Sequence, residues 1–164
     1  MTTAALAPSA SPAAHAFHFI HGRWTIANRR LKTRNAGAAD WDAFPSASTC
    51  EPRLGGAANV EEVVCPARGW TGMALRALDL QTGQWSIWWL NSLDGQLQPP
   101  VRGGFDGGVG VFVGPDMDGD QPILARFIWS DITPHSARWT QAFSYDGGMT
   151  WETNWIMDFT RAES

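Results

Sequence analysis

Apolar and polar residues alternate with a period of two along most of this chain, which is the pattern of half-buried β-strands. Short turns that contain Gly, Pro or Asp separate ten segments of this kind. We expect strands at residues 23–34, 46–54, 58–66, 70–79, 84–91, 96–105, 109–114, 121–131, 136–145 and 150–160. The sixth segment contains Pro99 and Pro100, which cannot donate to a ladder, so its first part is an edge, a bulge or a strand start. Helix is nearly absent, with short turns expected at 15–22 and 37–44.

The connections are short and sequential, which favours an antiparallel meander. Ten meandering strands most simply close into an up-and-down barrel, because closure removes exposed sheet edges. We therefore predict an all-β fold, an antiparallel up-and-down β-barrel of about ten strands with little helix. The domain is expected to span residues 16–164, after a flexible Ala/Ser/Pro-rich tail at residues 1–15.

Length, charge and composition limit the classes of function. The 164 residues suffice for one domain with a sizeable core. A net charge of −4 argues against a nucleic-acid partner. There is no apolar run long enough for a membrane span and no good signal peptide, so we expect a cytoplasmic protein. The chain has 10 Trp, and some of them are expected to line a cavity or an exposed patch.

The two cysteines are expected to be free thiols. A hairpin turning at Gly55–Gly56 places Cys50 opposite Glu61 and Cys65 opposite Ser46. The two thiols are then about 13 Å apart along the strands at ~3.3 Å per residue. A disulfide needs Cα atoms within about 7 Å.

The stretch SYDGGMTW resembles the Asp-box, a turn motif that recurs in sialidases and other carbohydrate-active propellers. A sugar site would need several blades and a much longer chain, whereas the motif occurs once here. It lies between two strong strand patterns, so we interpret it as a hairpin turn. The turn residues are Ser144, Asp146, Gly148, Thr150 and Trp151.

No metal site and no cofactor are expected. His15, His18 and His21 would spread over a helix or divide between the two faces of a strand. The acidic segment 115–122 resembles a calcium loop but lacks the required Gly and Glu positions, so it is interpreted as a solvated hairpin loop. His135 could in principle ligate haem, but no haem motif surrounds it.

Both ends of the strand pattern resemble the lipocalin signature, in which an Arg from the final strand covers a Trp at the closed end of the barrel. The residues are Gly22, Trp24 and Arg161, and a guanidinium over an indole face gains cation–π attraction. From about Phe17 onward the chain also resembles a family of uncharacterised bacterial proteins with lipocalin-like (calycin) barrels. The stretches that carry this resemblance are NVEE, WSIWWLNS, RFIWSDIT and RWTQAFSYDGGMTWETNWIMDFTR. The resemblance implies a barrel of about ten strands and implies no activity.

Alternation also predicts which side chains face inward. In the last strand Trp151, Thr153, Trp155, Met157 and Phe159 share the apolar face, and Gln141 shares the apolar face of the strand before it. Other polar residues interrupt strongly apolar strands, where a buried charge needs a partner. Together with aromatic walls they form our candidate ligand-binding set: Asn28, Arg30, Glu62, Arg76, Trp89, Arg126, Trp129, Gln141 and Trp155. Trp88 and Trp89 cannot both face inward, and the pattern does not decide between them.

Three functions remain open. The first is binding of a small, partly apolar and possibly anionic ligand in a Trp-rich barrel cavity. The second is an isomerase, cyclase or hydratase that uses a Glu62-like carboxylate as acid/base and an Arg, with no catalytic residue assigned. The third is a structural domain that forms a homodimer through exposed Trp patches. The absence of a nucleophile–base pair or phosphate loop favours the first.

Overall fold

The computed structural model describes residues 12–163, which form ten strands and four short 3-10 helices. The strands are β1 (Gly22–Leu31), β2 (Trp41–Arg53), β3 (Ala58–Cys65), β4 (Trp70–Leu78), β5 (Trp85–Asn91), β6 (Val101–Asp106), β7 (Val109–Asp118), β8 (Gln121–Ser130), β9 (Ser136–Ser144) and β10 (Glu152–Arg161). The helices are η1 (Pro12–His15), η2 (His18–Ile20), η3 (Leu54–Gly56) and η4 (Pro66–Arg68). None of the helices in this part of the chain is long and apolar enough to cross a membrane.

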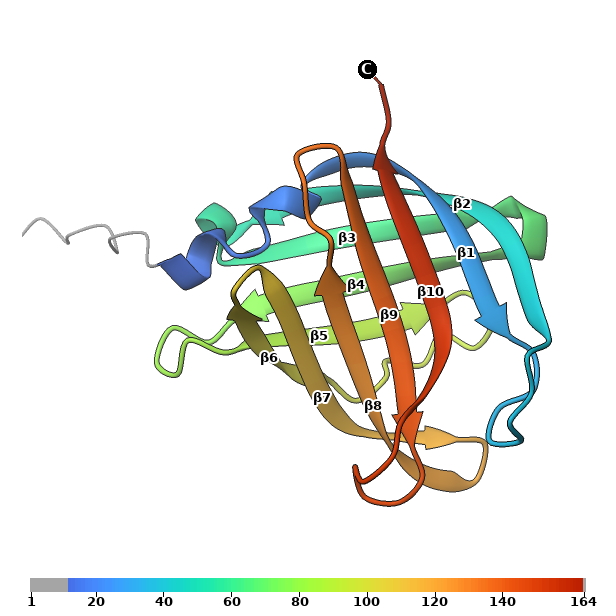
Figure 1. Ribbon diagram of the computed structural model, residues 1–164. Helices are drawn as coiled ribbons and strands as arrows, with labels where there is room; N and C mark the ends of the chain where they lie inside the picture. Colours follow the sequence, from blue (N-terminus) through green and yellow to red (C-terminus); the bar gives the residue numbers. More distant parts are fainter. Residues whose placement is uncertain (1–11, 164) are drawn as a thin grey trace, which may run out of the picture.

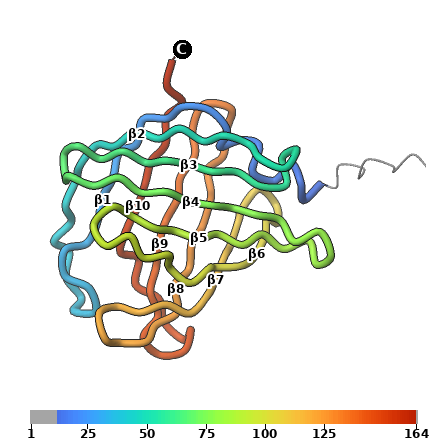
Figure 2. The backbone as a smooth tube through the Cα atoms, turned by 180° about the vertical axis from the view of Figure 1, so that it is seen from behind, coloured from blue at the N-terminus to red at the C-terminus, as the bar shows by residue number. Residues whose placement is uncertain are grey.

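The ten strands close into one antiparallel barrel (Figure 1). Each strand pairs with its neighbours in sequence, and β1 pairs with β10 to complete the ring. Strands β3 to β5 run across strands β7 to β10 when the molecule is seen from either side (Figures 1 and 2). The predicted up-and-down barrel of about ten strands is therefore confirmed, and no sheet edge is left open along the β1–β10 seam.

The 3-10 helices before β1 plug one end of the barrel. Phe17 is buried between them and packs edge-to-face on Trp85 and Phe105. The indole N–H of Trp85 donates to the carbonyl of Ala13, which ties η1 to β5. Of the segment predicted to be a tail, residues 1–11 lie outside the described residues, and the last four form η1 of this plug.

The predicted contact between Trp24 and Arg161 closes the same end. The two residues are opposite each other across β1 and β10, and the guanidinium carbon lies 4.2 Å from the indole centroid. Arg161 also donates to the carbonyls of Phe19, His21 and Pro134, each at 2.8 Å. One side chain therefore joins η2, β10 and the β8–β9 connection, at a seam that no short turn joins.

Gly22 makes this arrangement possible in two ways. Its φ of 108° is a conformation that L side chains rarely adopt. A Cβ atom at this position would also lie 2.9 Å from Nη1 of Arg161. The Gly-x-Trp pattern thus leaves room for the guanidinium that covers the indole.

Two local expectations are wrong. The segment 37–44 was expected to turn, but β2 begins at Trp41, because the alternation of buried and exposed residues already starts there. In β10 a β-bulge between Thr153 and Trp155 shifts the register. Asn154 and Trp155 are consequently both buried, whereas Thr153 is exposed and Trp151 packs on the turn instead of inside the barrel.

The register predicted for the hairpin that turns at Gly55–Gly56, between β2 and β3, is confirmed, since Cys50 lies opposite Glu61. Both cysteines are buried and free. Burial raises the pKa of the Cys50 thiol to about 12.

The SYDGGMTW segment forms the turn between β9 and β10. The Asp146 carboxylate accepts bonds from the Ser144 hydroxyl at 2.8 Å and from the Thr150 amide at 2.9 Å. The Gly148 amide donates to the Ser144 hydroxyl, and the Trp151 indole donates to the Gly148 carbonyl. The Thr150 bonds lower the pKa of Asp146 to about 2.

Candidate functional site

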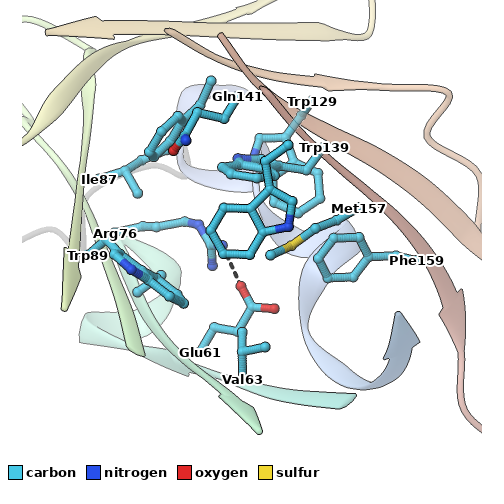
Figure 3. Close-up of a pocket in the computed structure, with 13 residues that line it drawn as sticks. Glu61, Val63, Arg76, Ile87, Trp89, Trp129, Trp139, Gln141, Met157 and Phe159 are labelled. Atoms are coloured by element: carbon cyan, nitrogen blue, oxygen red, sulfur yellow. Dashed lines mark hydrogen bonds and ion pairs between the residues drawn. The ribbon is translucent and has the colours of Figure 1, made fainter. Parts of the chain in front are cut away.

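The barrel encloses a cavity of about 50 Å³ between the plug and the opposite end. It is lined mainly by apolar and aromatic side chains, with a small polar group on one side (Figure 3). The lining residues are Glu61, Val63, Ala74, Arg76, Ile87, Trp89, Phe127, Trp129, Trp139, Gln141, Trp155, Met157 and Phe159. An apolar chamber with few convergent polar groups is typical of small-molecule sites.

A buried ion pair between Glu61 of β3 and Arg76 of β4 forms the polar side of the cavity. Nη2 of Arg76 donates to Oε2 of Glu61 at 2.5 Å, and the side chains are 4% and 3% exposed. Nη1 of Arg76 donates to Oδ1 of Asn59 at 2.9 Å and contacts the Cys50 sulfur at 3.9 Å. The pair balances its own charge, which is the condition for keeping two ionised groups out of water.

Three polar atoms of the cavity lining have no hydrogen-bond partner within residues 12–163. They are Oε1 of Glu61, Nε of Arg76 and the indole Nε1 of Trp129, and all three are buried. The Arg76 guanidinium lies 5.6 Å from the Trp129 ring centroid, so the polar and aromatic walls meet. One unpaired acceptor and two unpaired donors therefore belong to residues that line a single chamber, and each costs about 1–3 kcal/mol while it lacks a partner.

The bulge in β10 builds the opposite wall. Because it turns Asn154 inward beside Trp155, Nε2 of Gln141 can donate to Oδ1 of Asn154 at 2.8 Å. The indole of Trp155 donates to Oδ1 of Asn28. Nδ2 of Asn28 in turn donates to the hydroxyl of Ser46. Trp155 is thus fixed by a chain of hydrogen bonds across three strands.

A second, smaller hollow of about 40 Å³ lies at the end of the barrel opposite the plug. Its residues are Arg30, Trp70, Trp89, Asn91, Leu93 and Trp155. Trp89 and Trp155 line both hollows, and with Trp70 they form three mutual edge-to-face pairs at centroid distances of 5.9 to 6.4 Å. We refer to Trp70, Trp89 and Trp155 as the tryptophan partition, because they separate the inner cavity from the mouth.

Most residues of the predicted ligand-binding set do lie inside the barrel. Those that line the inner cavity are Arg76, Trp89, Trp129, Gln141 and Trp155. Asn28 is buried below Trp155, and Arg30 lies at the mouth with its guanidinium 4.3 Å from the Trp155 centroid. Between the two adjacent tryptophans of β5, Trp89 faces inward and its neighbour Trp88 faces outward.

Glu62 and Arg126 were expected to face inward, and the structure corrects both. In β3 the residues Glu61 and Val63 are buried, so Glu62 between them is exposed. In β8 the inward residues flank Arg126, whose guanidinium lies outside the barrel over the Trp151 ring, 4.3 Å from its centroid. The inward carboxylate is therefore Glu61, one position before the one predicted.

The side chains that line the cavity offer hydrogen bonds and aromatic contacts to a bound molecule. Cys50 lies beside Arg76, yet its raised pKa leaves it a protonated thiol at neutral pH and a poor nucleophile. Between Pro12 and Glu163, no three side chains of His, Cys, Asp or Glu lie together in a way that could hold a metal ion.

No protein-family model and no curated protein sequence matches the chain. Among solved structures, the fold is similar to that of an S-type phycobiliprotein lyase from Guillardia theta, with a TM-score of 0.56. The match covers 90% of this chain and 91% of that chain, at 11% sequence identity. A likeness at this identity shows a shared lipocalin-like barrel and nothing of the activity.

Proposed function

We propose that the protein binds a small, predominantly apolar molecule with an N–H or O–H donor inside the barrel. One observation carries this proposal: Oε1 of Glu61 is buried without a partner at the edge of a tryptophan-walled cavity. A ligand donor at this oxygen would recover the free energy lost by burying it. The unpaired N–H groups of Arg76 and Trp129 would donate to an acceptor group of the same ligand.

The cavity is small, so binding of a ring-sized ligand requires side chains of its walls to move. An engineered apolar cavity of roughly 150 Å³ accepts benzene, so a ring-sized ligand requires this cavity of about 50 Å³ to widen. Met157 lines it and is a flexible, unbranched side chain that repacks readily. The tryptophan partition is the other movable wall, because displacing it would join the inner cavity to the mouth.

The donor requirement is tested with indole and 1-benzofuran, two rings of the same shape that differ in the N–H group. Isothermal titration of the purified protein should show saturable binding of indole, about tenfold tighter than benzofuran. In the variant Glu61→Gln the single amide oxygen is expected to stay with Arg76 and an NH2 donor replaces the free oxygen, so the preference should fall to about twofold or less. Glu62→Gln is the matched control and should leave both affinities unchanged, because this side chain is exposed.

Native mass spectrometry of freshly purified protein complements the titration. An extra mass that disappears on denaturation would identify a resident ligand and support the proposal. The absence of saturable binding for either ring, together with the bare chain mass, would overturn it. Equal affinities for the two rings in the unsubstituted protein would show that Glu61 does not accept a hydrogen bond from the indole N–H.

A linear tetrapyrrole is a second candidate ligand, favoured by the similarity to a phycobiliprotein lyase over most of both chains. Such a ligand has pyrrole N–H donors that suit the free oxygen of Glu61. It is far larger than the cavity, so it could enter only with the mouth opened. A shift of the long-wavelength absorption band of biliverdin on titration with the protein would support this candidate, and an unchanged spectrum would exclude it.

A further inference from the structure

Arg30 lies at the barrel mouth and has no carboxylate within ion-pair distance among residues 12–163. Its cross-strand neighbour on β2 is Asp42, which shares its side of the sheet. That carboxylate is already engaged by Arg68, whose Nε and Nη2 donate to it at 2.8 and 2.5 Å. The charge of Arg30 is thus left without an anionic partner in the barrel.

The position of this guanidinium is fixed by the tryptophan partition. Arg30 stacks over Trp155 at 4.3 Å, and Trp155 is itself held by the bond from its indole to Asn28. Desolvation and the charge of Arg34 both lower the pKa of Arg30. A cation held in this way over an aromatic face is preorganised for an oxyanion.

The mouth hollow and the inner cavity share two walls. Trp89 and Trp155 line both, so a molecule that displaced either ring would occupy one continuous space. Trp89 is packed against Gly72 of β4, where a Cβ atom would lie 2.1 Å from Cη2 of the indole. The glycine leaves room for this ring against β4, in a position where it lines both hollows.

We propose that the ligand is an amphipathic anion whose oxyanion binds Arg30 at the mouth and whose apolar body passes the tryptophan partition into the inner cavity. This inference rests on the proposed function and adds the class of molecule. The polar group belongs at the mouth because a free cation is there. The body belongs inside because the inner walls are aromatic and their cation, Arg76, is already paired with Glu61.

The probes are indole-3-acetate, indole-3-propionate and indole-3-butyrate, each compared with its own amide. Every acid and amide pair has the same size and differs in charge, and the three tether lengths cover different reaches from the inner cavity to the mouth. Titration of the full chain should show at least one acid that binds about tenfold more tightly than its amide. Raising the salt concentration should reduce this ratio, because the mouth is exposed to solvent.

Arg30→Gln should abolish the preference for the acid and lower the affinity of the amide far less than that of the acid. The amide therefore reports whether the inner cavity has survived the substitution. Arg29→Gln is the matched control: Arg29 is the preceding residue of β1, faces outward and contacts Asp158 at 3.6 Å. It should keep the full preference.

Two negative outcomes are distinct. If indole and the amides bind but no acid exceeds its amide by more than twofold, the Arg30 site is refuted and the proposed function stands. If neither indole nor any derivative binds and native mass spectrometry shows only the bare chain mass, the proposed function fails and this inference fails with it. An acid preference that persists in Arg30→Gln would also refute the assignment, since another cation would then be responsible.

Discussion

Substitution of Arg76 tests whether water is excluded from the inner cavity, through the change in the free energy of unfolding. Arg76→Met keeps the approximate length of the side chain but leaves Glu61 as an unpaired carboxylate on a side chain that is 3% exposed. Breaking a buried pair on one side costs about 3–5 kcal/mol, because the remaining charge has lost its partner. Loss of the 2.9 Å bond to Asn59 adds to this value.

The double variant Glu61→Met and Arg76→Met should recover most of that loss. Replacing both members of a buried pair by apolar groups of similar volume is often close to neutral. The three variants and the original chain form a double-mutant cycle, for which we expect a coupling free energy of about 3 kcal/mol. Urea unfolding followed by tryptophan fluorescence and far-UV circular dichroism measures all four free energies of unfolding.

A surface pair provides the comparison. Arg138 and Asp158 are about 40% exposed, and Nε of Arg138 donates to the carboxylate at 2.7 Å. Arg138→Met should change the free energy of unfolding by less than about 1 kcal/mol, since water screens this pair. If Arg76→Met costs no more than Arg138→Met, the interior pair is solvated and the reasoning about a dry, ligand-ready cavity is refuted.

Three further predictions concern other parts of the barrel. Gly72→Ala should lower the free energy of unfolding by about 1–3 kcal/mol, because the new Cβ overlaps the Trp89 ring. Gly104→Ala is the control and should be nearly neutral, because nothing lies within 4 Å of its Cβ position. Equal effects of the two substitutions in urea unfolding would contradict this prediction. Arg161→Met should cost about 2–4 kcal/mol through loss of three hydrogen bonds and a cation–π contact, and an unchanged thermal midpoint would show that the seam does not depend on it. The pKa of Asp146 is lowered from 3.8 to about 2, so its stabilising bonds are fully present above about pH 4 and are lost as the pH falls towards 2. Asp146→Asn should therefore flatten the dependence of stability on pH in that window, and parallel curves for the two proteins would contradict this prediction.

Alternation along the strands was sufficient to predict the barrel. A strand of this closed barrel has one face towards the core and the other towards solvent. The period of two is therefore visible in the sequence. The contact that closes the barrel was also expected, because Gly22, Trp24 and Arg161 resemble the lipocalin signature, and the guanidinium does lie over the indole. Both signals are local or concern pairs with an evident chemical reason to meet.

The inward-facing residues of the site were harder to predict, because the same period of two gives no margin for error. An error of one residue reverses the face of a side chain, and Glu61 and Glu62 are adjacent carboxylates with no difference in type. The hairpin register already placed Glu61 opposite Cys50, and cross-strand partners share a face, so this contact could have identified the inward carboxylate. The bulge at Asn154 had no comparable signal, because no Gly or Pro marks it.

The β1–β10 seam has a consequence for the order of folding. β1 is among the first strands of the domain to be synthesised, but one of its two edges stays unpaired until β10 emerges from the ribosome. Contacts between such distant segments form slowly, because a long loop must close first. A nascent chain that stalls before Trp155 would lack both the strand that seals this edge and the ring that fills the barrel mouth. It would expose a hydrogen-bonding edge and an apolar interior together, which makes it a natural client for chaperones that shield strand edges.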